Sequence, residues 1–312
     1  MQHAMIPTNG IEMHVVEHGI GTPVLLCHGF PDTWRGWRNQ MVALADVGYR
    51  AIAVDMRGYG RTTAPEDASE YTQFHVVGDL VGLLDHLNLP TVTIVGHDFG
   101  ATTAWHAALF RPDRFTAVFG ISVVYRMRGE TSLLEQLRAA GREDDFYMFR
   151  QMRPEADTAW ADASRSIPAA LYNASGSPAP RDRWNPFNPA RPLHAAPPDV
   201  LPPWIDPDDL AHTIAEFERT GFHGGLNWYR SIQRSFELTA PFKDAMIRQP
   251  SFFLRGDVDG LKVVGNSSLE TLHTSLPGLR GTVELDQVGH WPQQEAPVAT
   301  NRALLDFLHS LA

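Results

Sequence analysis

Three groups of side chains in this sequence could together support nucleophilic catalysis. Asp98 is the centre of the pentapeptide Gly-His-Asp-Phe-Gly, Asp257 and Asp259 stand in the segment Gly-Asp-Val-Asp, and His290 stands in Gly-His-Trp. A carboxylate can attack an electrophilic carbon and form an ester. A histidine that is oriented by an acid can then activate water to hydrolyse that ester.

The residues around Asp98 predict a sharp turn between a buried strand and a helix. Residues 91–95 are all β-branched, and residues 101–110 are small or apolar at helical spacing. Glycines at positions 96 and 100 leave room for a strained turn, as in a nucleophile elbow. The helix N-terminus should keep the Asp98 carboxylate ionised. The alternative is that Asp98 only caps the helix, which is a common role for aspartate.

The acid and the histidine are predicted to follow the carboxyl ends of later strands. Asp257 and Asp259 come after the apolar residues 252–254, and His290 comes after the next strand. Because parallel strands end on one side of a sheet, these side chains could meet Asp98 there. The spacing Gly-x-x-Asp favours Asp259 as the acid, and Asp257 is expected to be solvated. Taken alone, His290 is more simply a hydrogen-bonded loop residue, since the chain has 14 histidines.

Strands and helices alternate through most of the chain, which predicts an α/β fold with a mostly parallel sheet flanked by helices. Asn9-Gly10 is a hairpin signal, so residues 4–18 should form an antiparallel pair at the sheet edge. The other predicted strands lie at 23–27, 49–54, 91–95, 115–124, 251–254 and 282–285, and predicted helices at 37–47, 72–88, 101–110 and 294–311.

The pattern changes from residue 125 to residue 239. Strand signals disappear, and residues 175–207 are too rich in proline for regular structure. Helical patterns cover 131–140, 145–151, 157–172, 208–220 and 226–236. We therefore expect an α/β core at 1–124 and 240–312, with an all-helical cap inserted at 125–239. A separate second domain is the alternative.

Composition places limits on partners. The chain has 312 residues, of which 43% are hydrophobic, and a formal charge of −10, which disfavours nucleic acid and anionic membranes. Its single cysteine, Cys27, excludes an intramolecular disulfide and a cysteine-based metal site, and is expected to be a small buried side chain that fills space in the core.

No signal sequence or membrane-spanning stretch is recognisable, so a cytoplasmic location is the default expectation. The oligomeric state stays open, with a homodimer among the options.

Two further turns follow predicted strands. Residues 28–31, His-Gly-Phe-Pro, could be a simple turn, or the Phe30 N–H could join that of Phe99 in a two-donor oxyanion hole of the kind found in α/β hydrolases. Residues 55–61 contain two glycines and two arginines. We interpret them as a structural turn that is held by an arginine–carboxylate pair.

The chain resembles the soluble epoxide hydrolases of the α/β-hydrolase fold over essentially its whole length. The resemblance is carried by HGFP at 28–31, DMRGYG at 55–60, GHDFG at 96–100, GFHGGLNWYR at 221–230, GDVD at 256–259 and GHW at 289–291. The Asn-Trp-Tyr-Arg run is the most specific and implies that Tyr229 is one of the two lid tyrosines of this family. Tyr147, seven residues before Pro154, is implied as the second, with a neighbouring aromatic or a purely apolar role as alternatives.

The resemblance implies a reaction that needs no metal and no cofactor. Tyr229 and Tyr147 would polarise the oxygen of a small hydrophobic epoxide while Asp98 attacks a ring carbon. His290, oriented by Asp259, would then deprotonate the water that hydrolyses the ester. The N–H groups of the predicted oxyanion hole would stabilise the intermediate, and the product would be a vicinal diol.

Other functions fit these residues less well. A haloalkane or haloacid dehalogenase would use the same Asp98 and His290, but such enzymes typically carry Trp or Arg after the nucleophile, where this chain has Phe99. A serine esterase would need serine at position 98. A metal hydrolase is disfavoured by the lack of ligand spacing among the histidines. A non-catalytic protein that binds a hydrophobic ligand is the alternative from a different class.

Overall fold

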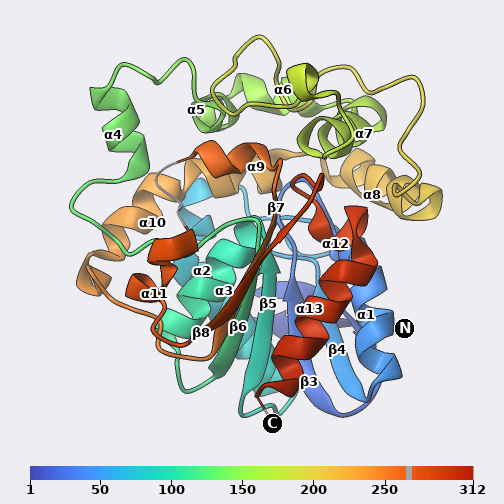
Figure 1. Ribbon diagram of the computed structural model, residues 1–312, viewed down its shortest axis with the longest axis vertical. Coiled ribbons are helices and arrows are strands. Elements are labelled where there is room, and N and C mark those ends of the chain that lie inside the picture. Colours follow the sequence, from blue (N-terminus) through green and yellow to red (C-terminus); the bar gives the residue numbers. More distant parts are fainter. Residues whose placement is uncertain (265–268, 312) are drawn as a thin grey trace.

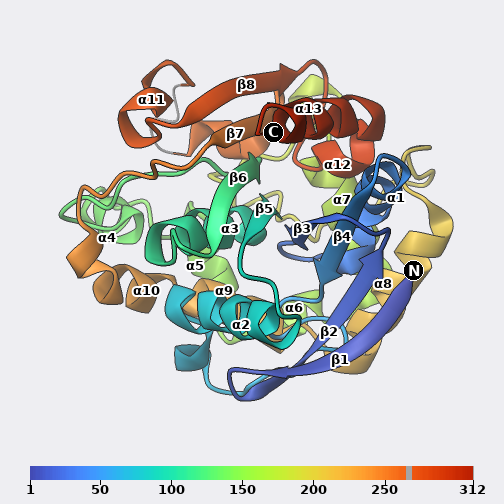
Figure 2. The same ribbon diagram turned by 90° about the horizontal axis from the view of Figure 1, so that it is seen from below.

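The computed structural model describes residues 1–264 and 269–311, and its centre is an eight-stranded sheet (Figures 1 and 2). The strand order is β1-β2-β4-β3-β5-β6-β7-β8. β2 pairs antiparallel with β1 and β4, and every other neighbouring pair is parallel. The strands are β1 (Gln2–Thr8), β2 (Ile11–His18), β3 (Thr22–Cys27), β4 (Tyr49–Val54), β5 (Val92–His97), β6 (Phe115–Ile121), β7 (Ser251–Gly256) and β8 (Leu279–Leu285). The predicted fold class is confirmed.

Helices cover both faces of the sheet. α2 and α3 pack together on one face, and α1 and α13 pack together on the other (Figure 2). Two separate hydrophobic clusters result, because the sheet lies between them. The helices outside the region between β6 and β7 are α1 (Arg38–Asp46), α2 (Gln73–His86), α3 (Phe99–Phe110), α11 (Leu272–Ser275), α12 (Pro292–Glu295) and α13 (Pro297–His309).

Helices dominate the segment between β6 and β7, and in Figure 1 much of it lies above the sheet. They are α4 (Leu133–Ala139), α5 (Tyr147–Met152), α6 (Glu155–Trp160), α7 (Ala163–Ala174), α8 (Pro207–Thr220), α9 (His223–Arg230) and α10 (Ile232–Leu238). Residues 122–250 are all described, and their only strand-like contact is an isolated bridge between Arg128 and Lys243. The proline-rich loop contains one 3-10 turn, Pro180–Asp182, and its last proline opens α8, where a proline is well tolerated.

Three predicted helices are each divided in two. The helix expected at 157–172 is α6 and α7, because the Asp162 side chain accepts the Arg165 N–H and starts a new helix. The helix expected at 294–311 is α12 and α13, divided at Pro297, which has no N–H to continue α12. The helix expected at 226–236 is α9 and α10, separated at Ser231.

The turn between β5 and α3 requires its glycines. Asp98 has a φ of 55°, a left-handed conformation that is unusual outside glycine. A Cβ on Gly100 would lie 2.0 Å from the Cys27 carbonyl oxygen, and one on Gly96 would lie 2.1 Å from the Gly100 carbonyl oxygen. The α3 backbone therefore approaches β3 and β5 too closely for any side chain at these two positions.

The Asp98 side chain does not cap α3. Asp98 occupies the N-cap position, and its main-chain carbonyl accepts the N–H groups of Ala101 and Thr102. Its carboxylate makes no capping hydrogen bond. The alternative that the Asp98 side chain only caps the helix is therefore wrong, and its carboxylate is available for other contacts.

No helix among the described residues is long and apolar enough to cross a bilayer.

The close approach at Gly100 gives a test of the turn. We expect Gly100→Ala to lower the free energy of unfolding by about 1–3 kcal/mol, because the added methyl group forces the backbone of α3 away from β3. Gly129→Ala is the control, since a Cβ there meets nothing within 4 Å. Urea unfolding of both variants measures the difference, and equal midpoints would contradict the steric account.

Candidate active site

Asp98, Asp259 and His290 lie just beyond the carboxyl ends of three strands of the sheet. Asp98 follows β5, Asp259 follows β7 and His290 follows β8. All three residues are buried, with exposed fractions of 7%, 3% and 5%. The sheet thus brings together groups that are nearly 200 positions apart in the sequence.

The His290 imidazole lies between the two carboxylates. Its Nε2 is 3.4 Å from Asp98 Oδ2, and its Nδ1 is 3.1 Å from Asp259 Oδ2. The other oxygen of Asp259 accepts the Leu261 N–H at 2.8 Å, which fixes the carboxylate. Asp257, which we expected to be solvated, is half-buried instead. The geometry allows one carboxylate to orient the imidazole while the other faces its second nitrogen.

Mutual attraction among these charges overcomes the cost of burying them. Burial lowers the pKa of His290, but Asp259 and Asp98 outweigh that effect and raise it to about 10. Burial acts to raise the pKa of Asp98, but its contacts with His290 bring it below the usual value. Asp98 is therefore ionised at neutral pH, as a nucleophilic carboxylate must be.

Residues that the sequence did not single out hold the backbone of His290. His97 Nε2 and Ser122 Oγ both donate to the His290 carbonyl oxygen, at 2.7 and 2.9 Å. Burial lowers the pKa of His97 to about 3, so its ring is neutral. Both contacts join residues distant in sequence, and no local pattern indicated them.

One of the two predicted oxyanion donors contacts the Asp98 carboxylate. The Phe30 N–H donates to Asp98 Oδ1 at 3.0 Å. Phe99 is the first residue of α3, where N–H groups have no partner within the helix. Phe30 thus contacts the carboxylate directly, and Phe99 follows Asp98 in the chain.

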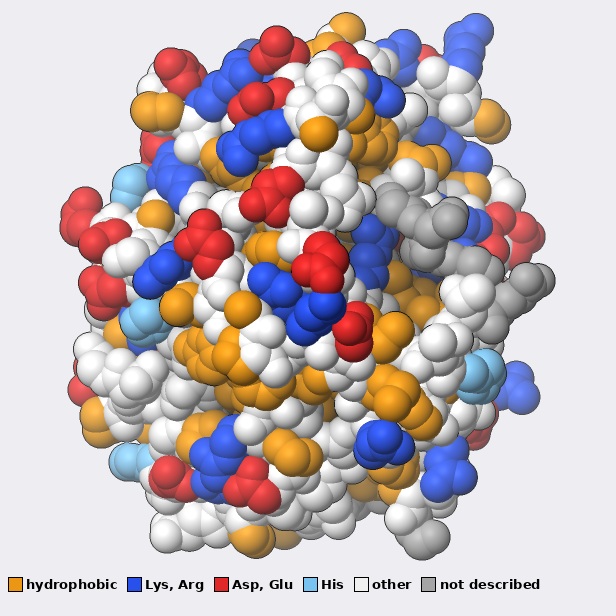
Figure 3. Space-filling model, turned by 90° about the vertical axis from the view of Figure 1, so that its left-hand side faces the viewer, with side chains coloured by type: hydrophobic (Ala, Val, Ile, Leu, Met, Phe, Trp, Pro, Cys, Tyr) orange, Lys and Arg blue, Asp and Glu red, His pale blue; other side chains and the backbone are white. Residues whose placement is uncertain are grey.

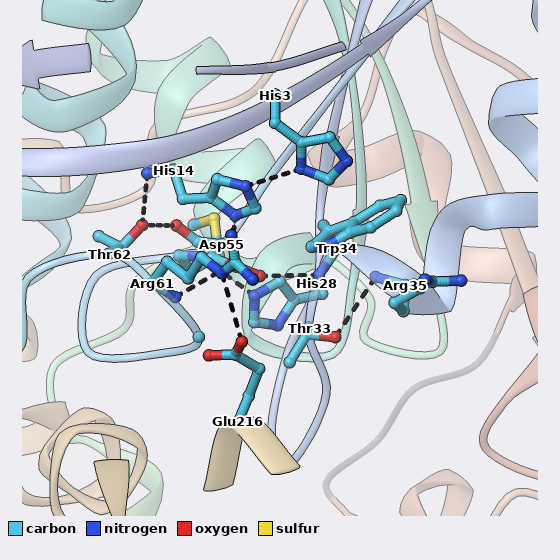
Figure 4. Close-up of polar contacts among 12 residues, drawn as sticks. His3, His14, His28, Thr33, Trp34, Arg35, Asp55, Arg61, Thr62 and Glu216 are labelled. Atoms are coloured by element: carbon cyan, nitrogen blue, oxygen red, sulfur yellow. Dashed lines mark hydrogen bonds and ion pairs between the residues drawn. The ribbon is translucent and has the colours of Figure 1, made fainter. Parts of the chain in front are cut away.

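A buried polar network supports the loop that carries Phe30. The Asp55 carboxylate accepts the N–H groups of Trp34 and Arg61 at 3.0 and 3.1 Å, and lies 2.7 Å from His14 Nδ1 (Figure 4). His28 Nε2 accepts the Met56 N–H at 3.0 Å. These contacts tie the segment after β3 to the segment after β4.

The turn at 55–61 is also held by the predicted arginine–carboxylate pair. Arg57 donates to both oxygens of Asp79 on α2, at 2.6 and 2.8 Å, and both residues are buried. A bidentate pair of this kind fixes orientation as well as distance.

Tyr229 and Tyr147 lie next to each other on α9 and α5. Their rings are 6.0 Å apart and nearly perpendicular, and both residues are buried. The Phe30 and Phe99 rings contact Tyr229 edge to face, at 5.4 and 4.7 Å. Burial, with Asp98 as a further cause, raises the pKa of each phenol well above its usual value. Both hydroxyls therefore keep their protons at neutral pH.

An apolar cavity of about 300 Å³ reaches the Asp98 carboxylate. Asp98 and Tyr147 both line it, together with Trp105, Leu133 and Ile232. Figure 3 shows the side of the molecule on which α4 and α10 lie, where hydrophobic side chains gather in a hollow between charged ones. Such a cavity suits a small, mostly apolar molecule. Within the described ranges, no three His, Cys, Asp or Glu side chains are placed to hold a metal ion.

Comparisons with known proteins agree with this architecture. A family model described as alpha/beta hydrolase fold matches residues 22–297. The chain is 56% identical to an epoxide hydrolase of Caballeronia sordidicola, over 98% of this chain and 93% of the relative. It is 41% identical to epoxide hydrolase 3 of Siraitia grosvenorii, over 99% and 98% of the two chains.

Solved structures show the same similarity in three dimensions. An epoxide hydrolase from an endophytic Streptomyces superimposes with a TM-score of 0.93 at 38% identity, covering 99% of this chain and 96% of the other. An epoxide hydrolase from Vigna radiata gives a TM-score of 0.89 at 34% identity, covering 99% and 98%. The chain belongs to the α/β-hydrolase fold family and, within it, to the epoxide hydrolases.

Proposed function

We propose that this protein hydrolyses epoxides to vicinal diols through a covalent ester on Asp98. The observation that carries the proposal is that Asp98, which is ionised, and Tyr147, which is protonated, line one apolar cavity, while the His290 imidazole lies 3.4 Å from the Asp98 carboxylate. The names of the relatives, all similar over nearly the whole chain, support the same reaction.

In the first step, the Asp98 carboxylate attacks a carbon of the epoxide ring. The ring C–O bond breaks as the ester C–O bond forms, and the negative charge moves to the former ring oxygen. Tyr229 and Tyr147 donate hydrogen bonds, and then a proton, to that oxygen. Their raised pKa values keep the protons in place until the alkoxide develops.

In the second step, His290 takes a proton from water, which attacks the carbonyl carbon of the Asp98 ester. The Phe30 and Phe99 N–H groups stabilise the oxyanion that forms on the carboxyl oxygen. The bond between the carboxyl carbon and the alkoxide oxygen then breaks. The carboxyl proton passes to that oxygen, so the diol leaves and the Asp98 carboxylate is restored. The proton that His290 took from water then replaces the one that a tyrosine gave up in the first step.

Ester formation lowers the pKa of His290, and the second step needs this change. The Asp98 charge is one cause of the raised pKa of His290, after Asp259. An ester carries no charge, so alkylation of Asp98 removes that contribution and lowers the pKa of His290. A larger fraction of His290 is then neutral, and a neutral imidazole can take the proton from water in the second step.

We further propose that residues 125–239 act as a cap over the site and that residues 1–124 and 240–312 form its core. Both lid tyrosines belong to helices of this segment, and Tyr229 packs against Phe30 and Phe99 of the core. A cytoplasmic location stays a prediction, and a homodimer stays one option for the oligomeric state. Dehalogenation is not favoured, because the residue after Asp98 is Phe99, whose side chain has no N–H to hold a departing halide.

The role of His290 can be tested by trapping the ester. We expect His290→Gln to form the ester on Asp98 but not to hydrolyse it, so incubation with styrene oxide should add the mass of one substrate to the protein. Intact-protein and peptide mass spectrometry measure the adduct and its position. An unmodified variant that releases no diol would contradict the order of the two steps.

The two tyrosines should act on ring opening alone. We expect Tyr229→Phe or Tyr147→Phe to slow ester formation by about 10²-fold, the usual size of general acid catalysis, and to leave ester hydrolysis nearly unchanged. Rapid-quench kinetics separate the two steps. Tyr49→Phe, at the opposite end of the sheet on β4, is the control. An equal effect on both steps would argue against a role as proton donors.

The coupling between Asp98 and His290 should be visible in a titration. Asp98→Asn removes a charge that favours the imidazolium, so the pKa of His290 should fall below its wild-type value, mimicking the ester. NMR of histidine ring nitrogens, with His290 assigned by its absence from the His290→Gln variant, measures both titrations. An unchanged or higher pKa in Asp98→Asn would contradict the electrostatic account.

A further inference from the structure

Glu295 makes an unusual set of contacts next to the His290 loop. It is the last residue of α12, and its carboxylate accepts N–H groups from Gly289 and Trp291, the residues on either side of His290. Oε2 is 3.0 Å from the Gly289 nitrogen, and Oε1 is 2.9 Å from the Trp291 nitrogen. The carboxylate thus holds the main chain on both sides of the imidazole.

The same carboxylate reaches the helical cap. Its Oε2 accepts the Gly176 N–H at 2.8 Å, just beyond the end of α7. Within residues 1–264 and 269–311, no arginine, lysine or histidine forms an ion pair with Glu295. Main-chain donors alone therefore stabilise its charge, and hydrogen bonds to an ionised acceptor are among the stronger ones.

Cap and core backbones meet closely at this point. The His290 N–H donates to the Ala174 carbonyl oxygen at 2.9 Å. A Cβ on Gly176 would lie 2.0 Å from the Gln287 carbonyl oxygen, and one on Gly289 would lie 2.3 Å from the Ser175 carbonyl carbon. Glycine at both positions lets the two segments touch, and Glu295 bonds to both.

We propose that Glu295 is a positioning residue that locks the His290 loop to the cap segment 174–176 and so sets the imidazole for the hydrolysis of the ester. This role rests on the proposed function, because it assigns Glu295 to the second of the two steps. In this role Glu295 acts on His290 through the main-chain N–H groups of Gly289 and Trp291.

The proposal predicts that the two steps respond differently to loss of the carboxylate. Ring opening needs Asp98 and the phenols, whereas ester hydrolysis needs the imidazole in place. Glu295→Gln keeps the shape of the side chain, but its NH₂ group would face main-chain donors. A displacement of about 1 Å at a reacting group can cost about 10²-fold, so we expect ester hydrolysis to slow about 10- to 100-fold, with ring opening changed less than about 3-fold.

Glu216→Gln is a matched control. Glu216 is a buried carboxylate on α8 that also joins cap to core, because it contacts Arg61 at 3.4 Å as well as Arg219 (Figure 4). It has no contact with the His290 loop. A general loosening of the cap should therefore affect both variants, whereas a specific role of Glu295 should affect one.

Single-turnover kinetics and mass spectrometry with styrene oxide provide the test. Accumulation of the ester in Glu295→Gln but not in Glu216→Gln supports the proposal. Equal accumulation in both variants, or in neither, overturns it. A wild-type protein that forms neither ester nor diol would instead count against the proposed function, and the exchange measurement below would then decide the role of Glu295 alone.

Hydrogen–deuterium exchange tests the lock without any substrate. We expect faster exchange at 174–176 and 289–291 in Glu295→Gln and wild-type rates there in Glu216→Gln. Unchanged exchange in Glu295→Gln overturns the proposal. If that variant fails to fold, Glu295→Asp replaces it: the carboxylate is one methylene shorter, so faster exchange in the two segments supports the lock and wild-type rates overturn it.

Discussion

The constraint on which the site depends is the burial of two carboxylates and one imidazole in contact with each other. None of the three charges would be stable alone in an apolar interior. Asp259 and Asp98 outweigh the effect of burial on His290, and His290 does the same for Asp98. The three side chains meet only if the ends of β5, β7 and β8 stay in register, so the contacts among these charges depend on the pairing of the sheet.

Sequence patterns predicted the parts of the site that local structure determines. Asp98 was recognisable because glycines at positions 96 and 100 indicate a tight turn between a strand and a helix. The contact that excludes a side chain at Gly100, with the Cys27 carbonyl oxygen of β3, arises only in the folded chain. His290 and Asp259 were recognisable because each follows a strand. The roles of Tyr229 and Tyr147 were predicted from the resemblance to a family. Hydrophobic periodicity alone would have assigned both residues to the apolar interior of the helical segment.

The residues that hold His290 in place could not be predicted in this way. His97, Ser122 and Glu295 act through main-chain atoms that only the folded chain brings near. A side-chain hydrogen bond to a main-chain carbonyl or N–H group can come from many residue types and leaves no motif. Some predicted helix boundaries were wrong for a related reason. Pro297 ends one helix and begins another, and periodicity alone does not distinguish a continuous helix from two in line.

The two proposed steps draw on different parts of the chain, so the contact between the proposed cap and the proposed core matters for both. The phenols that assist ring opening come from α5 and α9, whereas the imidazole comes from the loop after β8. The phenols must face the oxygen of an epoxide whose carbon meets Asp98, and the imidazole must face Asp98 itself, so a shift of residues 125–239 would misplace the phenols relative to the imidazole. Tyr229 packs on Phe30, which itself donates to Asp98, and the His290 N–H bonds to Ala174. Tyr229 and His290 are thus positioned in part by contacts between residues 125–239 and the rest of the chain, so the geometry of the reaction depends on how these two parts pack against each other.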